Sequence, residues 1–227
     1  MTTGAQASRK HPGEATLLAY ASGRLPVAHR LVIASHAGGC AHCRGLIRAA
    51  EWAGGRLLDA LPAAPVRRGA LEQCLAQLDA SRPSPDRPRE AAPQLLVGGV
   101  PLPAPLRRLK PARLRWLAPG IRHGTLYRDD DGTLHLLRVR PDVALPEHLH
   151  AGLELTCVLQ GSFHDGDGRY AKGDVSEAGE DPEEGGDGGH HLVVAEPPGD
   201  CVCLLATSGP VHFKHWALRL LQPLSPF

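Results

Sequence analysis

Aromatic residues and long apolar runs are both scarce in this chain. Three Trp, three Tyr and three Phe occur among 227 residues, so a core must be built mainly from Leu, Val, Ile and Ala. Residues 1–15 contain no apolar stretch of the kind that marks a secretory signal peptide. No uninterrupted apolar run approaches the roughly 18 to 20 residues of a membrane span. We therefore expect a cytoplasmic protein with no membrane partner.

An excess of charge of either sign is also absent. The 25 Lys and Arg residues almost balance the 24 Asp and Glu residues, so electrostatics give no general reason to expect direct nucleic-acid or membrane binding. Thirteen His residues, in contrast, are a high number and hint at metal chemistry. In a reducing cytosol, six Cys residues are more often ligands or redox thiols than a disulfide framework.

The composition divides the chain into three parts. Residues 1–81 show helical periodicity, and residues 82–111 form a proline-rich segment without a period. Residues 112–227 show short alternating runs separated by Gly, Asp and Pro turns. The sequence therefore predicts an α+β multidomain protein, in which a linker joins a small helical domain to an all-β sandwich or barrel. Such a linker lets two modules meet across a modest interface.

The boundaries of individual elements follow from turn and capping residues. Four helices are expected, with the first two bounded by Glu14 and Gly23 and by Pro26 and Gly39. The third runs from about Ala41 past Trp52, and the fourth covers residues 70–80. Strands are expected at 133–140, 153–159, 192–195, 202–207 and 212–220, and an acidic, Gly-rich loop at 177–189.

A cluster of His36, Cys40 and Cys43 follows the second expected helix in an H-x3-C-x2-C pattern. The x2 spacing lets two thiolates grip one ion, because the backbone between them curls around it. Soft thiolates combined with imidazole are typical of a closed, four-coordinate structural zinc. The pattern therefore predicts a zinc site that needs one more ligand.

Three histidines are candidates for the fourth ligand of this site: His11, His29 and His42. His42 lies between the thiolates and is expected to point away from the ion. His29 stands about two helical turns before His36 and cannot easily converge with it. We favour His11, because the first helix can fold back antiparallel to the second and bring His11 near His36.

A second ligand set of different chemistry lies in the C-terminal half. His148 and His150 are two residues apart, so in a strand they face the same side, and Glu154 can join them. Imidazoles with a carboxylate suit zinc or another divalent transition metal. With the turn residue Gly161, the pattern H-x-H-x3-E-x6-G resembles the first motif of the cupin family.

The second cupin motif is less clear in this sequence. The Gly turn of that motif is matched by residues 170–174, and its downstream His is either His190 or His191. The family pattern favours His191 as the fourth ligand, because Ala195, Cys201 and Cys203 then follow at the expected distances. The long acidic insertion departs from the compact motif and leaves His190 as the alternative.

Two further thiols, Cys201 and Cys203, share one face of an expected strand. Their Cα atoms would be roughly 6.5 to 7 Å apart, at the upper limit for a relaxed disulfide. We therefore consider them either buried, inert thiols or redox-sensitive thiols without a structural disulfide. Cys74 and Cys157 are expected at core positions.

The N-terminal ligands and their flanking segments 17–26 and 40–44 together resemble the zinc-binding anti-sigma domain. With a C-terminal cupin, the chain resembles the ChrR-like anti-sigma factors over about residues 11–80 and 101–222. The resemblance implies a small helical zinc-binding bundle followed by a cupin jelly-roll barrel. It also implies that the helical domain wraps an extracytoplasmic-function-type sigma factor and hides its polymerase-binding surfaces.

Two functions are compatible with these features. In the first, the helical domain inhibits the sigma factor, and the cupin metal site senses oxidative stress, such as singlet oxygen or an organic hydroperoxide, and triggers release. The alternative is a metal-dependent cupin enzyme of the dioxygenase or decarboxylase type with an accessory zinc domain. We favour the regulator, because no acid–base constellation stands beside the ligands and catalysis does not need a thiolate zinc domain. The sequence does not name the sigma factor, the signal, the cupin metal or the oligomeric state.

Overall fold

The computed structural model describes residues 10–80, 96–97, 99–110, 113–145, 148–150, 152–179, 192–208 and 211–213. For residues 148–150 and 211–213 only the backbone is described. The candidate ligands His190 and His191 lie outside the described residues, and so does most of the expected acidic loop.

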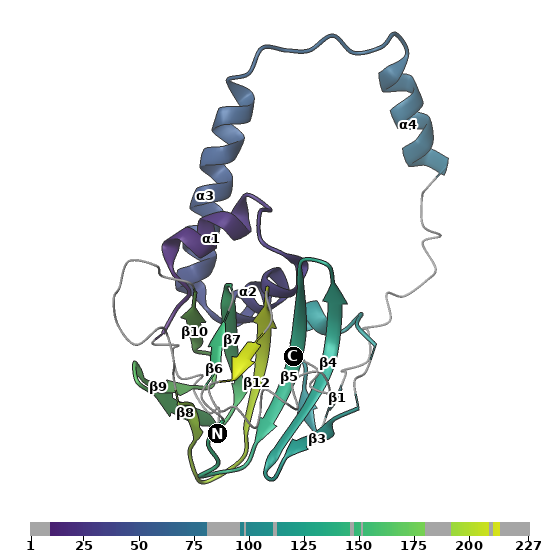
Figure 1. The fold of residues 1–227 in the computed structure, drawn as a ribbon. Helices are drawn as coiled ribbons and strands as arrows, with labels where there is room; N and C mark the ends of the chain where they lie inside the picture. The colour runs from purple at the N-terminus through teal and green to yellow at the C-terminus, as the bar shows by residue number, and fades with distance from the viewer. Residues whose placement is uncertain are drawn as a thin grey trace, which may run out of the picture.

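The N-terminal part of the chain is helical (Figure 1), with elements α1 (Glu14–Ala21), α2 (Val27–Gly39), α3 (Ala41–Asp59) and α4 (Ala70–Ala80). All four expected helices are confirmed at nearly the expected boundaries. Gly23 lies after α1 with a φ of +71°, a conformation that favours glycine. Pro26 directly precedes α2, where its missing N–H costs no helical hydrogen bond.

The C-terminal part, called here the β domain, is an antiparallel sandwich of two main sheets. The larger sheet has the strand order β10-β7-β12-β5-β4-β3 and the smaller one the order β11-β8-β9. The strands of the larger sheet are β3 (Arg115–Ala118), β4 (Ile121–Asp129), β5 (Gly132–Val139), β7 (Glu154–Gln160), β10 (Val175–Ala178) and β12 (Cys201–Thr207). The smaller sheet contains β8 (Ser162–Asp165), β9 (Gly168–Ala171) and β11 (Val194–Ala195), and a separate pair joins β6 (His148–His150) to β13 (Val211–Phe213). The expected α+β organisation is therefore confirmed.

The second half of the proline-rich segment is more ordered than its composition suggests. It contains a short hairpin of β1 (Leu96–Val97) and β2 (Val100–Pro101), followed by the 3₁₀ helix η1 (Ala104–Leu106). Leu102 and Leu106 are buried, and η1 packs against α2. Apolar residues between the prolines therefore anchor this part of the segment to α2. The sequence did not reveal this contact, because the segment has neither helix nor strand periodicity. The domain boundaries themselves stay a prediction.

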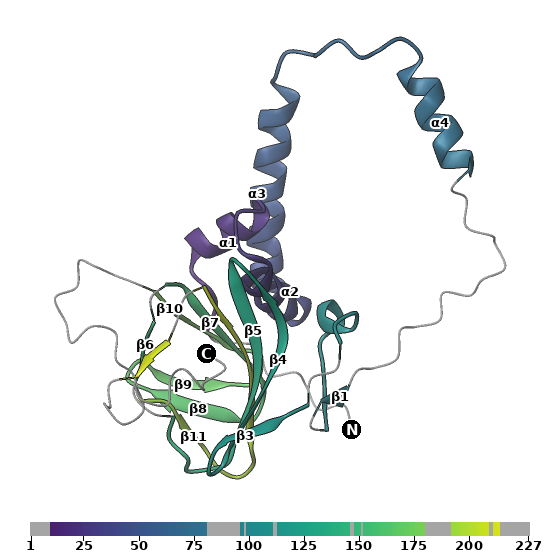
Figure 2. The same cartoon turned by 45° about the vertical axis from the view of Figure 1, so that its right-hand side comes forward.

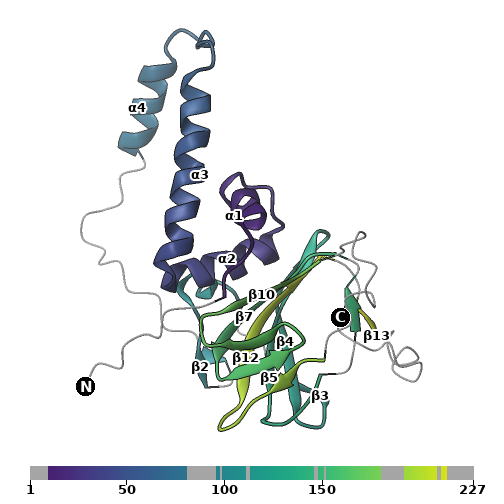
Figure 3. The ribbon, with the colours of Figure 1, turned by 90° about the vertical axis from the view of Figure 1, so that its left-hand side faces the viewer.

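Helix α2 lies directly on the larger sheet, against β5, β7 and β12 (Figures 2 and 3). Its residues Val32 and Ile33 are fully buried in one core cluster with Leu136 and Leu204 of the β domain. A second core cluster lies between the two sheets, around Phe163. The two parts of the chain thus share an apolar core, which is a closer association than the modest interface expected from a proline-rich linker.

The second half of α3 and the whole of α4 project away from this body (Figure 2). Apart from Ala70, every residue from 51 to 80 is exposed, and we call this segment the arm. Within the described part of the chain, no helix is both long enough and apolar enough to cross a membrane.

Candidate metal centre and its surroundings

The structure brings the four favoured N-terminal ligands together. The ligand atoms of His11, His36, Cys40 and Cys43 all lie within 4.8 Å of one another. His11 precedes α1, His36 lies in the last turn of α2, and the two cysteines flank the start of α3. Three of the four side chains are buried, so the group forms a compact and largely buried site.

The local geometry follows from the junction between α2 and α3. Cys40 leaves α2 with an extended backbone (φ −107°, ψ 109°) and becomes the N-cap of α3. Its sulfur accepts a hydrogen bond from the backbone N–H of Cys43 at 3.5 Å. The Cys40 sulfur therefore satisfies one of the free N–H groups at the start of α3.

The spacing of the donor atoms fits a tetrahedral zinc ion. His11 Nδ1 lies 3.5 Å from both the Cys40 and the Cys43 sulfur atoms, and His36 Nε2 lies 3.2 Å from the Cys43 sulfur. Zinc bonds of about 2.3 Å to sulfur and about 2.0 to 2.1 Å to nitrogen place such atoms about 3.6 Å apart. The residues present therefore match the size and the chemistry of a closed structural zinc site.

Burial keeps two of the ligand groups uncharged. Burial lowers the pKa of His36, which keeps its imidazole neutral and able to donate a lone pair. Burial and the neighbouring Cys40 raise the pKa of Cys43 to about 12, so this thiol does not ionise at neutral pH by itself. A bound dication would supply the positive charge that favours the thiolate.

The two other histidines considered for this site take different places. The ring of His42 lies 4.8 Å from that of His11, centroid to centroid, but His42 is not part of the ligand group. His29 is completely buried and points instead to the β domain, with Nε2 2.8 Å from the carbonyl oxygen of Leu153. Burial lowers the pKa of His29, which keeps the ring neutral.

The second ligand set is only partly described. His148 and His150 lie in β6, where they pair in register with Phe213 and Val211, and their side chains are not described. Glu154 is the first residue of β7 and is almost fully buried. Burial raises the pKa of its carboxyl group to about 8, and Thr156 donates to it at 3.3 Å. A carboxylate in this position would be stabilised by a nearby cation.

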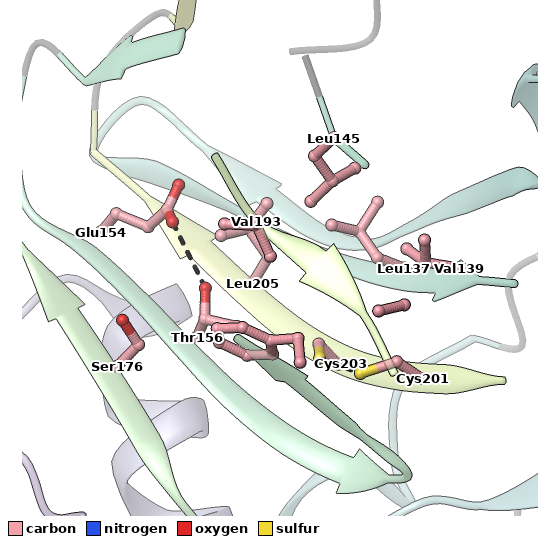
Figure 4. A pocket seen from close by; sticks show the side chains of 12 residues that line it. Leu137, Val139, Leu145, Glu154, Thr156, Ser176, Val193, Cys201, Cys203 and Leu205 are labelled. Carbon is pink, nitrogen blue, oxygen red and sulfur yellow. Dashed lines mark hydrogen bonds between the residues drawn. The ribbon is translucent and has the colours of Figure 1, made fainter. Parts of the chain in front are cut away.

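Glu154 lines a mainly apolar cavity inside the β domain, together with the two thiols of β12 (Figure 4). In this view Glu154 lies apart from the two thiols, with Thr156 between them. The sulfur atoms of Cys201 and Cys203 are 3.5 Å apart and form no disulfide. Its hydrogen bond with Cys201 is the main cause of the raised pKa of Cys203, and burial is the second cause. A raised pKa disfavours the reactive thiolate.

The other two cysteines differ in their surroundings. Cys157 is buried, as expected, and burial raises the pKa of its thiol to about 12. Cys74 is exposed, so its expected core position is wrong. The apolar stripe of α4 does mark one face of a helix, but that helix buries none of its residues in the body of the protein.

The sequence did not reveal which residues of the helical part and of the β domain contact one another. Gly173, Asp174 and Glu177 approach the N-terminal part from the β domain, and Lys10 and His29 approach the β domain in return. The only sequence signal was the placement of His29 and His36 about two turns apart, on one face of α2.

Comparisons with known proteins find a curated relative and a solved structure that are similar to this chain. No family model matches the chain. The anti-sigma-E factor ChrR of Cereibacter sphaeroides is 37% identical over 220 residues, which cover 95% of this chain and 97% of the relative. The solved structure of Rhodobacter sphaeroides SigE in complex with the anti-sigma ChrR contains a chain of 34% identity and TM-score 0.70. This match covers 88% of the present chain and 99% of the other.

Proposed function

The chain belongs to the ChrR family of anti-sigma factors, and we propose that it binds and inhibits an extracytoplasmic-function-type sigma factor through the arm. The matched solved structure is a complex between a sigma factor and the anti-sigma protein, and the similarity extends over nearly the whole of that chain. The same membership supports a cytoplasmic, regulatory role.

The observation that carries this proposal is the apolar surface of the arm. Eight large apolar side chains there are at least half exposed: Trp52, Leu57, Leu58, Leu61, Val66, Leu71, Leu75 and Leu78. An isolated helix of fewer than about 12 to 15 residues is marginal in water, and α4 has 11. Such a helix with an uncovered apolar stripe is typical of an element that is stabilised by a protein partner.

A charge introduced into this apolar surface tests the proposal. The full-length chain is purified together with its bound protein, which is identified by mass spectrometry as a sigma factor. Leu75→Asp places a carboxylate on the apolar face of α4, whereas the matched control Gln77→Asp places it on the opposite face. We expect Leu75→Asp to weaken sigma binding at least about tenfold, because a buried charge without a partner is costly, and Gln77→Asp to bind normally. Equal binding by both variants would remove the arm from the interface.

The N-terminal ligand group has a structural part in this proposal. We propose that His11, His36, Cys40 and Cys43 hold zinc, which fixes the start of α3 relative to α1 and α2. A structural zinc contributes folding free energy directly. It would therefore keep the arm in a defined orientation for binding the sigma factor.

The β domain is the proposed sensor. We propose that His148, His150, Glu154 and His191, with His190 as the alternative fourth ligand, hold zinc or another divalent transition metal. Imidazole ligands are oxidisable, and the oxidation of a ligand weakens metal binding. An oxidative signal such as singlet oxygen or an organic hydroperoxide would then change the β domain and lower the affinity for the sigma factor.

This proposal needs neither redox chemistry at Cys201 and Cys203 nor an enzymatic reaction in the β domain. The raised pKa of Cys203 favours inert, buried thiols over redox-sensitive ones. The apolar cavity beside Glu154 is the feature that an enzyme of the dioxygenase or decarboxylase type would use. Turnover of an organic substrate by the metal-loaded chain would favour that alternative, whereas family membership supports the regulator.

A further inference from the structure

A backbone carbonyl of the β domain contacts a ligand of the N-terminal metal site. The Nδ1 atom of His36 lies 2.7 Å from the carbonyl oxygen of Gly173, in the turn between β9 and β10. His36 Nε2 faces the Cys43 sulfur, so the neutral ring donates its Nδ1–H to Gly173. Ligand histidines commonly use their second nitrogen in this way, which fixes the tautomer and the direction of the ring.

The residue next to His11 is tied to the same turn. The backbone N–H of Lys10 donates to the Asp174 carboxylate at 3.3 Å, and Val175 N–H donates to the Lys10 carbonyl at 3.2 Å. The Lys10 ammonium group donates to the Asp167 carbonyl at 2.7 Å. Because Lys10 is held at both its backbone and its side chain, the β domain sets the position from which His11 reaches the site.

Strand β10 also caps the helix that follows His11. The N-cap of α1, Gly13, has no side chain to accept a hydrogen bond from the free N–H groups of the first turn. The Glu177 carboxylate accepts from the Gly13 N–H at 2.8 Å and from the Thr16 hydroxyl at 2.5 Å. Its negative charge also suits the positive end of the helix dipole.

We propose that the β9–β10 turn and strand β10 complete the N-terminal metal site from outside, with Gly173, Asp174 and Glu177 as positioning residues. Gly173 orients His36, while Asp174 and Glu177 hold the segment on either side of His11. The inference rests on the zinc site under the proposed function and deepens it. The four ligands bind the ion, and the β domain determines how tightly they hold it.

The same strand provides a route between the two ligand sets. Side chains alternate along a strand, so Ser176 lines the inner cavity with Glu154 while Glu177 reaches α1 on the other face. Ala178 pairs in register with Glu154. A shift of β10 caused by a change at Glu154 would therefore move the positioning groups of the N-terminal site.

Cobalt binding by the full-length chain tests this inference. Co²⁺ replaces zinc in such sites, and thiolate ligation gives an absorption band that reports only on a site with bound cysteine. The variants are Glu177→Ala and Asp174→Asn. Glu196→Ala is the matched control, because Glu196 also accepts two hydrogen bonds, from Ser162 and Arg169, both within the β domain.

We expect Glu177→Ala and Asp174→Asn to weaken cobalt binding about tenfold, in the range found when outer partners of ligands are lost, with Glu196→Ala unchanged. A role in folding alone would lower the thermal stability of the metal-free and metal-loaded chains alike and leave cobalt affinity unchanged, which would overturn the inference. If wild type gives no thiolate–cobalt band, the zinc site of the proposed function is wrong, and this inference fails with it. A band in wild type with equal affinity in all variants overturns the inference alone.

Discussion

His29 donates from Nε2 to the carbonyl oxygen of Leu153 over 2.8 Å, and Leu153 directly precedes Glu154. His29 and His36 therefore attach α2 to the β domain at two points, one beside each ligand set. Both rings are buried and neutral, since burial lowers the pKa of each. Helix α2 thus acts as a structural member of the β domain as well as of the helical part.

Replacement of His29 should show how much this attachment contributes to stability. His29→Leu removes the hydrogen bond to Leu153 and should lower the free energy of unfolding by about 1 to 2 kcal/mol. His29→Gln keeps an amide donor and should lose less. Chemical denaturation of the full-length variants measures both values. Equal losses would show that the shape of the ring matters and the hydrogen bond does not.

Removal of one N-terminal thiolate should release zinc. Cys40→Ser is expected to lower the zinc content by about one ion per chain and to loosen α3, because a structural zinc supplies folding free energy. His42→Ala is the matched control, since His42 lies beside the site but is not one of its ligands. Zinc analysis and sigma binding check the prediction, and unchanged values in Cys40→Ser would rule the site out.

The cupin ligands are tested by metal analysis of single variants. His148→Ala should lower the metal content by about one ion per chain without emptying the N-terminal site. His191→Ala should behave in the same way, whereas His190→Ala should keep its metal. If His190→Ala alone loses the ion, the alignment of the second cupin motif is wrong.

The buried histidines should make stability depend on pH. Burial lowers the pKa of His135 from 6.5 to about 3. His135 takes up a proton near pH 6.5 in the unfolded chain but only near pH 3 in the folded chain. The free energy of unfolding is therefore unaffected by His135 above about pH 6.5 and decreases as the pH falls from there toward 3. In this range the free energy of unfolding should fall by about 1.4 kcal/mol per pH unit, because unfolding takes up one proton. Unfolding of wild type and His135→Gln between pH 4 and 7 measures it, and parallel curves would contradict the assignment.

The sequence was most informative where the necessary residues are close along the chain. The helix boundaries followed from Gly23, Pro26 and Gly39, and the convergence of His36, Cys40 and Cys43 followed from their spacing around one helix junction. The exposure of Cys74 was missed because an apolar stripe looks the same whether it faces a core or an absent partner.

The sequence by itself determined the ligand types, the division into helical and β parts and the family resemblance, because these depend on side-chain identity and local periodicity. The tertiary structure decided that α2 shares a core with the β domain and that Gly173, Leu153 and Glu177 contact the N-terminal part of the chain. Two of these three residues act there through backbone carbonyls, which every residue has, and all three are far along the chain from the groups they contact. Neither kind of contact leaves a pattern in the sequence, since only packing brings such atoms together.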